Sequence, residues 1–183
     1  NNDLLVLTKP EVVKEVHLQY FEAGADIVET NTFGATSIAQ SEYGLSHLAY
    51  EMNLAAARIA REAAEECSES SGRSCFVAGA IGPTNITLSA SADVDDASTR
   101  ASTWDEVYAA YVEQVKGLID GGSDIILIET IFDVLNSKAA IKATLDVFEE
   151  LEIELPIIIS VTFIQEGGDR TVFGQSVEAF WET

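Results

Sequence analysis

Polar side chains follow four short apolar runs of the sequence, at the point where each run ends. These polar segments are residues 29–31 (Glu-Thr-Asn), 84–85 (Thr-Asn), 129–130 (Glu-Thr) and 160–162 (Ser-Val-Thr). Two of them begin with a carboxylate, Glu29 or Glu129. Two carboxylates held at one place can bind an ammonium group or take part in a proton transfer. Each acid could equally cap the next helix or pair with an arginine, and the residues alone leave both roles open.

The elements that position these side chains alternate between strand and helix. Four apolar runs have the composition of strands buried on both faces, and they cover residues 27–28, 75–81, 125–128 and 157–162. Four further segments repeat apolar residues at helical spacing, and they cover residues 8–21, 45–63, 103–119 and 135–151. This order predicts a parallel sheet covered by helices. Because the working groups of such folds lie at the carboxyl ends of the strands, we expect the four polar segments to lie close together.

Local signals predict where several of these segments begin and end. Residues 8–11 and 103–106 each carry threonine and, three positions later, glutamate, which is the pattern of a capping box at a helix start. Residues 67–74 are polar and predict a loop after the second helix. Residues 86–102 are small, polar and acidic without a sustained period, and they predict a long surface loop.

A weak internal repeat accompanies this alternation. The sequence EAGADI at residues 22–27 resembles DGGSDI at residues 120–125, and each leads through apolar residues to Glu-Thr. Repeated units of helix, glycine, aspartate and strand favour a barrel over an open sheet.

The charge and hydropathy of the chain exclude several classes of function. The net charge is −21, from 31 acidic and 10 basic residues. Such a surface repels phosphate backbones and anionic lipid, so we expect no nucleic-acid or membrane partner. No apolar run reaches the length of a membrane helix and no signal peptide is recognisable, which predicts a cytoplasmic protein.

The two cysteines, Cys67 and Cys75, are not expected to form a disulfide in such a protein. Their separation of eight residues matches no common zinc-binding motif. At about 3.3 Å per residue, the strand that runs from Cys75 to Gly82 places Cys75 roughly 23 Å from the carboxyl end of the sheet.

The strand ends resemble those of a known family. Residues 21–33 (FEAGADIVETNTF) are similar to the second barrel strand of the homocysteine-binding domain of cobalamin-dependent methionine synthase, within the homocysteine S-methyltransferase family. Segments similar to the third and fourth strand ends of that family and to the segment after its fifth strand follow in the same order, at residues 82–85 (GPTN), 127–133 (LIETIFD) and 174–180 (GQSVEAF). The opening residues 1–5 also fit, so the resemblance covers the whole chain.

The resemblance implies an α/β fold of the (β/α)8 TIM type. Residues 1–183 are expected to cover about strands 2 to 5 of such a barrel with their helices, as one partial barrel domain truncated at both ends. The first strand is then expected before Asn1, and the three cysteines that hold zinc in this family are expected beyond Thr183. Cys67 and Cys75 match none of these three cysteines.

The activity that the resemblance implies is the transfer of a methyl group from methylcobalamin to homocysteine, which gives methionine. Zinc held by three cysteine thiolates binds the sulfur of homocysteine in this family and favours its thiolate. The implied cofactors of the full-length enzyme are therefore zinc and methylcobalamin, with none bound by these residues alone. The implied partners are homocysteine and the methyltetrahydrofolate and cobalamin modules of the same full-length chain.

The site residues that the resemblance implies all belong to the substrate site. Glu129 is the best match for a carboxylate that holds the ammonium group of homocysteine. Glu29, Asn31, Thr32 and Thr84 are expected to be wall or positioning residues. No catalytic residue and no metal ligand is expected within residues 1–183, so the isolated segment is expected to be inactive.

Two alternative functions remain open on the sequence. A betaine– or S-methylmethionine–homocysteine methyltransferase would use the same acceptor with a different methyl donor. A non-catalytic barrel that binds an amino acid and has lost its metal would keep the fold without the reaction. The sequences of residues 29–33 (ETNTF) and 82–85 (GPTN) favour the cobalamin enzyme.

Overall fold

Four parallel strands form one sheet in the computed structural model of the chain, which describes residues 1–91, 93, 95–96, 98–163 and 168–183. The strands are β1 (Ile27–Glu29), β2 (Phe76–Ile81), β3 (Ile125–Ile131) and β4 (Ile157–Val161). They lie side by side in the order of the sequence, β1-β2-β3-β4. Each strand pairs in parallel with the next, so all four carboxyl ends lie at the same edge of the sheet.

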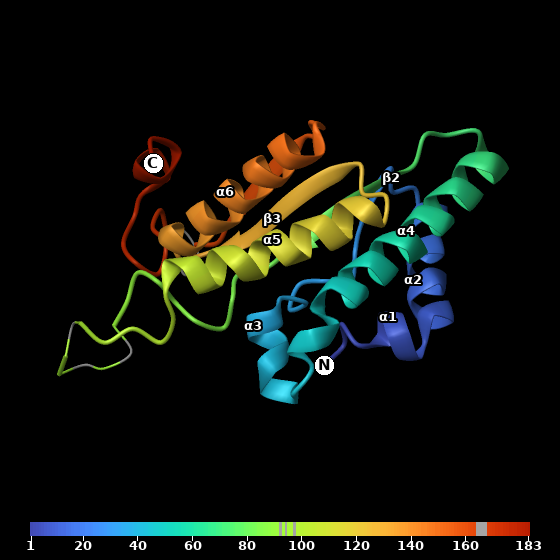
Figure 1. The fold of residues 1–183 in the computed structure, drawn as a ribbon. Coiled ribbons are helices and arrows are strands. Elements are labelled where there is room, and N and C mark those ends of the chain that lie inside the picture. Colours follow the sequence, from blue (N-terminus) through green and yellow to red (C-terminus); the bar gives the residue numbers. More distant parts are fainter. Residues whose placement is uncertain (92, 94, 97, 164–167) are drawn as a thin grey trace.

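Helices occupy the connections between the strands. The long ones are α2 (Pro10–Glu22), α4 (Ala49–Ser71), α5 (Trp104–Asp120) and α6 (Val134–Leu151). Helices α4, α5 and α6 lie side by side over one face of the sheet (Figure 1). Shorter elements complete the described chain: α1 (Leu5–Thr8), α3 (Ser37–Gln40), two 3-10 turns (Ser41–Tyr43 and Ser46–Leu48) and α7 (Val177–Trp181).

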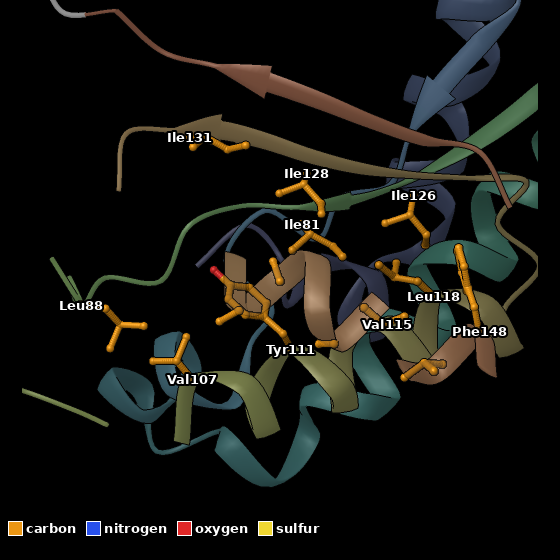
Figure 2. Packing of buried hydrophobic residues seen from close by; sticks show 14 of the residues in the cluster. Ile81, Leu88, Val107, Tyr111, Val115, Leu118, Ile126, Ile128, Ile131 and Phe148 are labelled. Carbon is orange, nitrogen blue, oxygen red and sulfur yellow. The ribbon is translucent and has the colours of Figure 1, made fainter. Parts of the chain in front are cut away.

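The main core lies between the sheet and helices α5 and α6. Ile126 and Ile128 of β3 point toward α5, where they meet Val115 and Leu118 (Figure 2). All four side chains are at most 2% exposed. Burial of this apolar surface is the main force that holds the helices on the sheet.

The opposite face of the sheet is open to solvent over much of its area. Alternate residues of a strand point to opposite faces, so Ile27, Phe76 and Ile158 lie on the face that no described helix covers. These three side chains are 44%, 43% and 41% exposed. The described sheet is therefore one-sided, with a covered helix face and an open inner face.

The internal repeat seen in the sequence is also a repeat in the structure. Gly24 and Gly122 both have positive φ, 105° and 98°, at the turn from helix to strand. Asp26 and Asp124 follow two residues later in each repeat. Asp124 pairs with Arg61 of α4, and Asp26 pairs with Arg73, which lies just after α4. Both repeats use a left-handed glycine and a paired aspartate to start a strand.

The structure confirms one predicted capping box and overturns the other. Thr103 and Glu106 form the reciprocal bonds of a capping box at the start of α5. The prediction for residues 8–11 is wrong, because α1 occupies residues 5–8 and the Thr8 hydroxyl donates to the carbonyl of Leu4. Lys9 is the N-cap residue of α2 and makes no side-chain cap bond, although Pro10 starts that helix as expected.

The predicted loop over residues 67–74 is also wrong for its first half. Helix α4 continues to Ser71 because Cys67 still lies on its buried face, and it ends at Gly72, which is left-handed with φ 72°. The described residues within 86–102 form no helix or strand, as expected, whereas residues 92, 94 and 97 lie outside the described part of the chain. No helix among the described residues is long and apolar enough to cross a membrane.

Candidate functional site

Glu29 ends β1, and Glu129 lies two residues before the end of β3, because β3 continues to Ile131 and not only to Ile128 as the sequence predicted. Both carboxylates lie on the open face of the sheet. Val28 and Ile128, the residues before them, are buried against the helices. Because side chains alternate along a strand, the two carboxylates point to the opposite face. Glu29 is exposed and Glu129 is half-buried. The structure thus places both predicted carboxylates on one face, separated by β2.

The two carboxylates also interact electrostatically. Burial raises the pKa of the Glu129 carboxyl above its ordinary value, and the nearby charge of Glu29 raises it further. The Thr130 hydroxyl, which donates a hydrogen bond of 3.3 Å to Glu129 Oε2, opposes this rise in pKa. A cation placed beside Glu129 would relieve both unfavourable effects, because it compensates the lost solvation and the repulsion. The site therefore suits a positively charged ligand group.

The threonines after β1 have a structural role that their polarity alone did not reveal. The Thr30 hydroxyl accepts a hydrogen bond from the backbone N–H of Ala80 (2.9 Å), and the Thr32 hydroxyl donates to the carbonyl of the same residue (2.6 Å). The two hydroxyl oxygens lie 2.6 Å apart. These side chains continue the pairing of β1 with β2 after the backbone of β1 has turned away. Thr32 is fully buried, so its side chain is not on the exposed surface beside Glu29.

Asn31 lies between these threonines and is half-buried. Its side-chain amide donates to the carbonyl of Asn2 (2.8 Å). Nearby, the backbone N–H of Gly34 donates to Asp3 Oδ1 (3.3 Å), and burial raises the pKa of the Asp3 carboxyl. The opening residues of the chain therefore pack directly on the end of β1, which the sequence did not reveal.

Thr84 belongs to a buried network on the helix side of its loop. Its hydroxyl donates to the carbonyl of Ile86 and accepts a hydrogen bond from the Asn136 side chain, each at 2.6 Å. The Tyr111 hydroxyl lies 3.1 Å from the carbonyl of Gly82, and burial raises the pKa of Tyr111. This network fixes the path of the loop after β2. Thr84 is 2% exposed, so any role that it has in the substrate site is a positioning role.

Asp133 is the second anchor of the same loop, and sequence reasoning did not single it out. Its carboxylate caps α6 by accepting from the backbone N–H groups of Leu135 and Asn136. It also accepts from the backbone N–H groups of Leu88 (2.7 Å) and Ser89 (3.0 Å). The position of Asp133 just before a helical pattern is a readable N-cap signal. Its reach across to residues 88–89 is visible only in the structure.

The two cysteines lie far from these carboxylates. Cys67 is on α4, and Cys75 directly precedes β2, so the pair sits at the amino end of the sheet. Their sulfur atoms are 2.8 Å apart and both residues are buried and free. Burial raises the pKa of the Cys75 thiol, whereas the hydrogen bond from that thiol lowers the pKa of Cys67.

The described residues do not fit a zinc site at the carboxyl edge of the sheet. Among the residues that the structure describes, no group of three or more histidine, cysteine, aspartate or glutamate side chains could hold a metal ion. Cys67 and Cys75 stand at the wrong end of the sheet and contact one another.

A hollow of about 690 Å³ opens beside Glu29, between α2 and β1. Its apolar wall includes Val12, Val16 and Tyr20 of α2, which are 44–63% exposed. Glu29 and Asn31 lie on its strand side. The open inner face of the sheet and this hollow are continuous, because Leu127 and Ile158 also line it.

Comparison with known proteins places this geometry in a family. The profile of the homocysteine S-methyltransferase family matches residues 1–183. The homocysteine methyltransferase MmuM from Escherichia coli has a similar fold: its metallated form aligns with a TM-score of 0.73 and 21% identity, over 96% of this chain and 59% of that chain. Its oxidized form aligns with a TM-score of 0.71 and 22% identity, over 94% of this chain and 57% of that one.

These comparisons confirm the predicted fold. The four-stranded parallel sheet with its helices matches part of the TIM-type barrel of a homocysteine methyltransferase. The chain spans less than two thirds of the length of these structural neighbours.

Proposed function

Since the chain belongs to the homocysteine S-methyltransferase family, we propose that it forms part of the homocysteine-binding domain of a cobalamin-dependent methionine synthase. The proposed reaction transfers a methyl group from methylcobalamin to the sulfur of homocysteine and gives methionine. The proposal rests on the similarity of the strand-end segments, in order, to those of that enzyme.

The role proposed for Glu129 is to hold the ammonium group of homocysteine. One observation carries this role: Glu129 is a half-buried carboxylate near the carboxyl end of β3, and the charge of Glu29 adds to the cost of ionising it. An ammonium group compensates that cost through a charge-assisted hydrogen bond. Glu29 supplies a second negative charge at longer range.

Asn31, Thr32 and Thr84 are proposed as residues that shape this site. Thr32 and Thr84 hold the ends of β1 and of the loop after β2 by hydrogen bonds to backbone carbonyl groups. Asn31 lines the hollow beside Glu29. None of these side chains is proposed to take part in the chemical step.

The cofactors and partners of the proposed enzyme come from outside residues 1–183. Zinc on three cysteine thiolates supplies a Lewis acid that favours the thiolate of homocysteine. We propose that residues of the same polypeptide beyond this segment hold the zinc. Methyltetrahydrofolate and cobalamin modules of that polypeptide would supply the methyl group, in the cytoplasm.

The test of the proposed function is the choice of methyl donor. The complete enzyme is incubated with homocysteine and, separately, with methylcobalamin, betaine or S-methylmethionine, and methionine is quantified. We expect methionine from methylcobalamin and at least 100-fold less from the other two donors. Turnover with betaine or S-methylmethionine instead would replace the proposal by the corresponding methyltransferase. Binding of homocysteine without product from any donor would identify a non-catalytic amino-acid-binding barrel.

A further inference from the structure

Thr130 has an unusual backbone conformation directly beside Glu129. Its φ is 56°, in the left-handed region, although threonine is β-branched and does not adopt this conformation readily. Among the described residues, the other non-glycine residue with positive φ is Glu152, at the end of α6. Strain of this kind is unfavourable and persists where the surrounding structure imposes it, commonly at functional sites.

The left-handed residue makes a bulge in β3. Ile128 pairs with Ile159 and Ile131 pairs with Val161, so β3 contains one more residue than β4 over this stretch. Ile128 and Ile131 both pack in the core on the helix side. In a regular strand, residues three positions apart point to opposite faces, so the bulge is what puts both isoleucines on the helix side.

The bulge therefore lets the end of β3 do two things at once. Ile131 returns to the helix core, and the side chains of Glu129 and Thr130 lie close enough to interact. The Thr130 hydroxyl then donates to Glu129 Oε2 at 3.3 Å.

Backbone geometry alone does not account for threonine at this position. Glycine adopts a φ near 56° without steric cost and would make the same bulge. Threonine adds strain and, in return, a hydroxyl donor within reach of the carboxylate. The side chain, and not the turn, is therefore the feature that needs an explanation.

We propose that Thr130 is a positioning residue, whose strained backbone and hydroxyl hold the Glu129 carboxylate in the orientation that receives the ammonium group of the substrate. This inference rests on the proposed function for its substrate. Its geometric part, the dependence of Glu129 on Thr130, does not.

Three variants of the complete enzyme separate the hydroxyl from the backbone strain. Thr130→Gly keeps the left-handed backbone and removes the hydroxyl, whereas Thr130→Ser keeps the hydroxyl. Glu152→Gly is the matched control, because it relieves the same kind of backbone strain at an exposed helix end. Steady-state kinetics are measured with homocysteine and with 4-mercaptobutanoate, which lacks the amino group.

The expected result is a loss that is confined to amine recognition. Thr130→Gly should raise the KM for homocysteine about 10- to 150-fold, the effect of losing one hydrogen bond to a charged group, with kcat changed less than twofold. Thr130→Ser should restore most of the loss. The KM for 4-mercaptobutanoate should stay within twofold in every variant. Thr130→Gly and Glu152→Gly should both unfold at or above the wild-type temperature.

A second readout decides the proposal independently of the substrate. The pKa of the Glu129 carboxyl is followed by NMR in protein labelled with ¹³C at glutamate carboxyls, with Glu129→Gln used for assignment. Thr130→Gly should raise this pKa, because the hydroxyl that favours the ionised form is gone, and Thr130→Ser should leave it near the wild-type value.

An unchanged Glu129 pKa in Thr130→Gly would overturn the proposal, whatever the substrate. A wild-type enzyme that does not distinguish homocysteine from 4-mercaptobutanoate would count against the proposed function instead. In that case a raised pKa in Thr130→Gly would still support the positioning role.

Discussion

Replacing Asp133 with asparagine should destabilise the protein strongly, although the two side chains have nearly the same shape. Asp133 is 2% exposed, and its two oxygens accept from five donors. Oδ2 accepts from the backbone N–H groups of Leu88 and Ser89, in the loop after β2. Oδ1 accepts from the Ser89 hydroxyl and from two N–H groups at the start of α6.

The size of the effect follows from which donors lose their acceptor. Asparagine has one carbonyl oxygen, and the better orientation keeps the three donors at Oδ1 and turns an NH₂ group toward Leu88 and Ser89. Leu88 is 6% exposed, so its N–H group cannot recover a bond to water, whereas Ser89 is exposed. Hydrogen bonds to a charged group contribute about 1.5–3 kcal/mol each, so the total loss is about 2–5 kcal/mol.

Urea unfolding of wild-type and Asp133→Asn protein, followed by circular dichroism, measures this loss. Amide hydrogen exchange should show the protection of Leu88 falling with it. Asp105→Asn is the matched control, because Asp105 is an exposed aspartate in the first turn of α5 and its loss should cost less than about 1 kcal/mol. A cost below 1 kcal/mol for Asp133→Asn, with Leu88 still protected, would refute the reasoning.

Three other predictions follow from the same structure. The folded state raises the pKa of the Glu129 carboxyl, so the ionised carboxylate opposes folding above the ordinary pKa of glutamate. Glu129→Gln should therefore unfold at a higher urea concentration than wild type at pH 7 and at the same urea concentration near pH 3. A variant that is less stable than wild type at pH 7 would contradict this. The 183-residue chain expressed alone should self-associate in size-exclusion chromatography, because its inner face is apolar and exposed and the outer edges of β1 and β4 are unpaired among the described residues; a cooperatively melting monomer would argue against it. The same chain should hold no tight zinc, and a stoichiometric site in a chelator competition that Cys75→Ser abolishes would count against the placement of the zinc ligands elsewhere.

The sequence was sufficient for the order of the elements because its strongest signals are local. The four apolar runs predicted the four strands, and their parallel order followed from the helical segments between them. The capping box at Thr103 was correct because nothing else competes for that threonine. At Thr8 the same pattern misled, since a preceding helical turn uses the hydroxyl for its own carbonyl.

The site was predicted less completely, because its geometry depends on contacts between distant residues. The rule that parallel strands share one carboxyl edge correctly predicted that the segments carrying Glu29 and Glu129 lie at the same edge of the sheet. It could not show that Thr32 is used to extend the pairing of β1 with β2. It also could not show the left-handed Thr130, because a bulge depends on the register with the neighbouring strand.

The most direct test of the proposed substrate site is the effect of Glu129→Gln on the preference for an amino group. The measurement is the ratio of kcat/KM for homocysteine to kcat/KM for 4-mercaptobutanoate, in wild type and in the variant of the complete enzyme. Truncating one partner of a hydrogen-bonded charge pair costs on the order of 2–5 kcal/mol, so this ratio should fall by a factor of about 30 to a few thousand. A ratio equal to that of wild type would remove Glu129 from the substrate site.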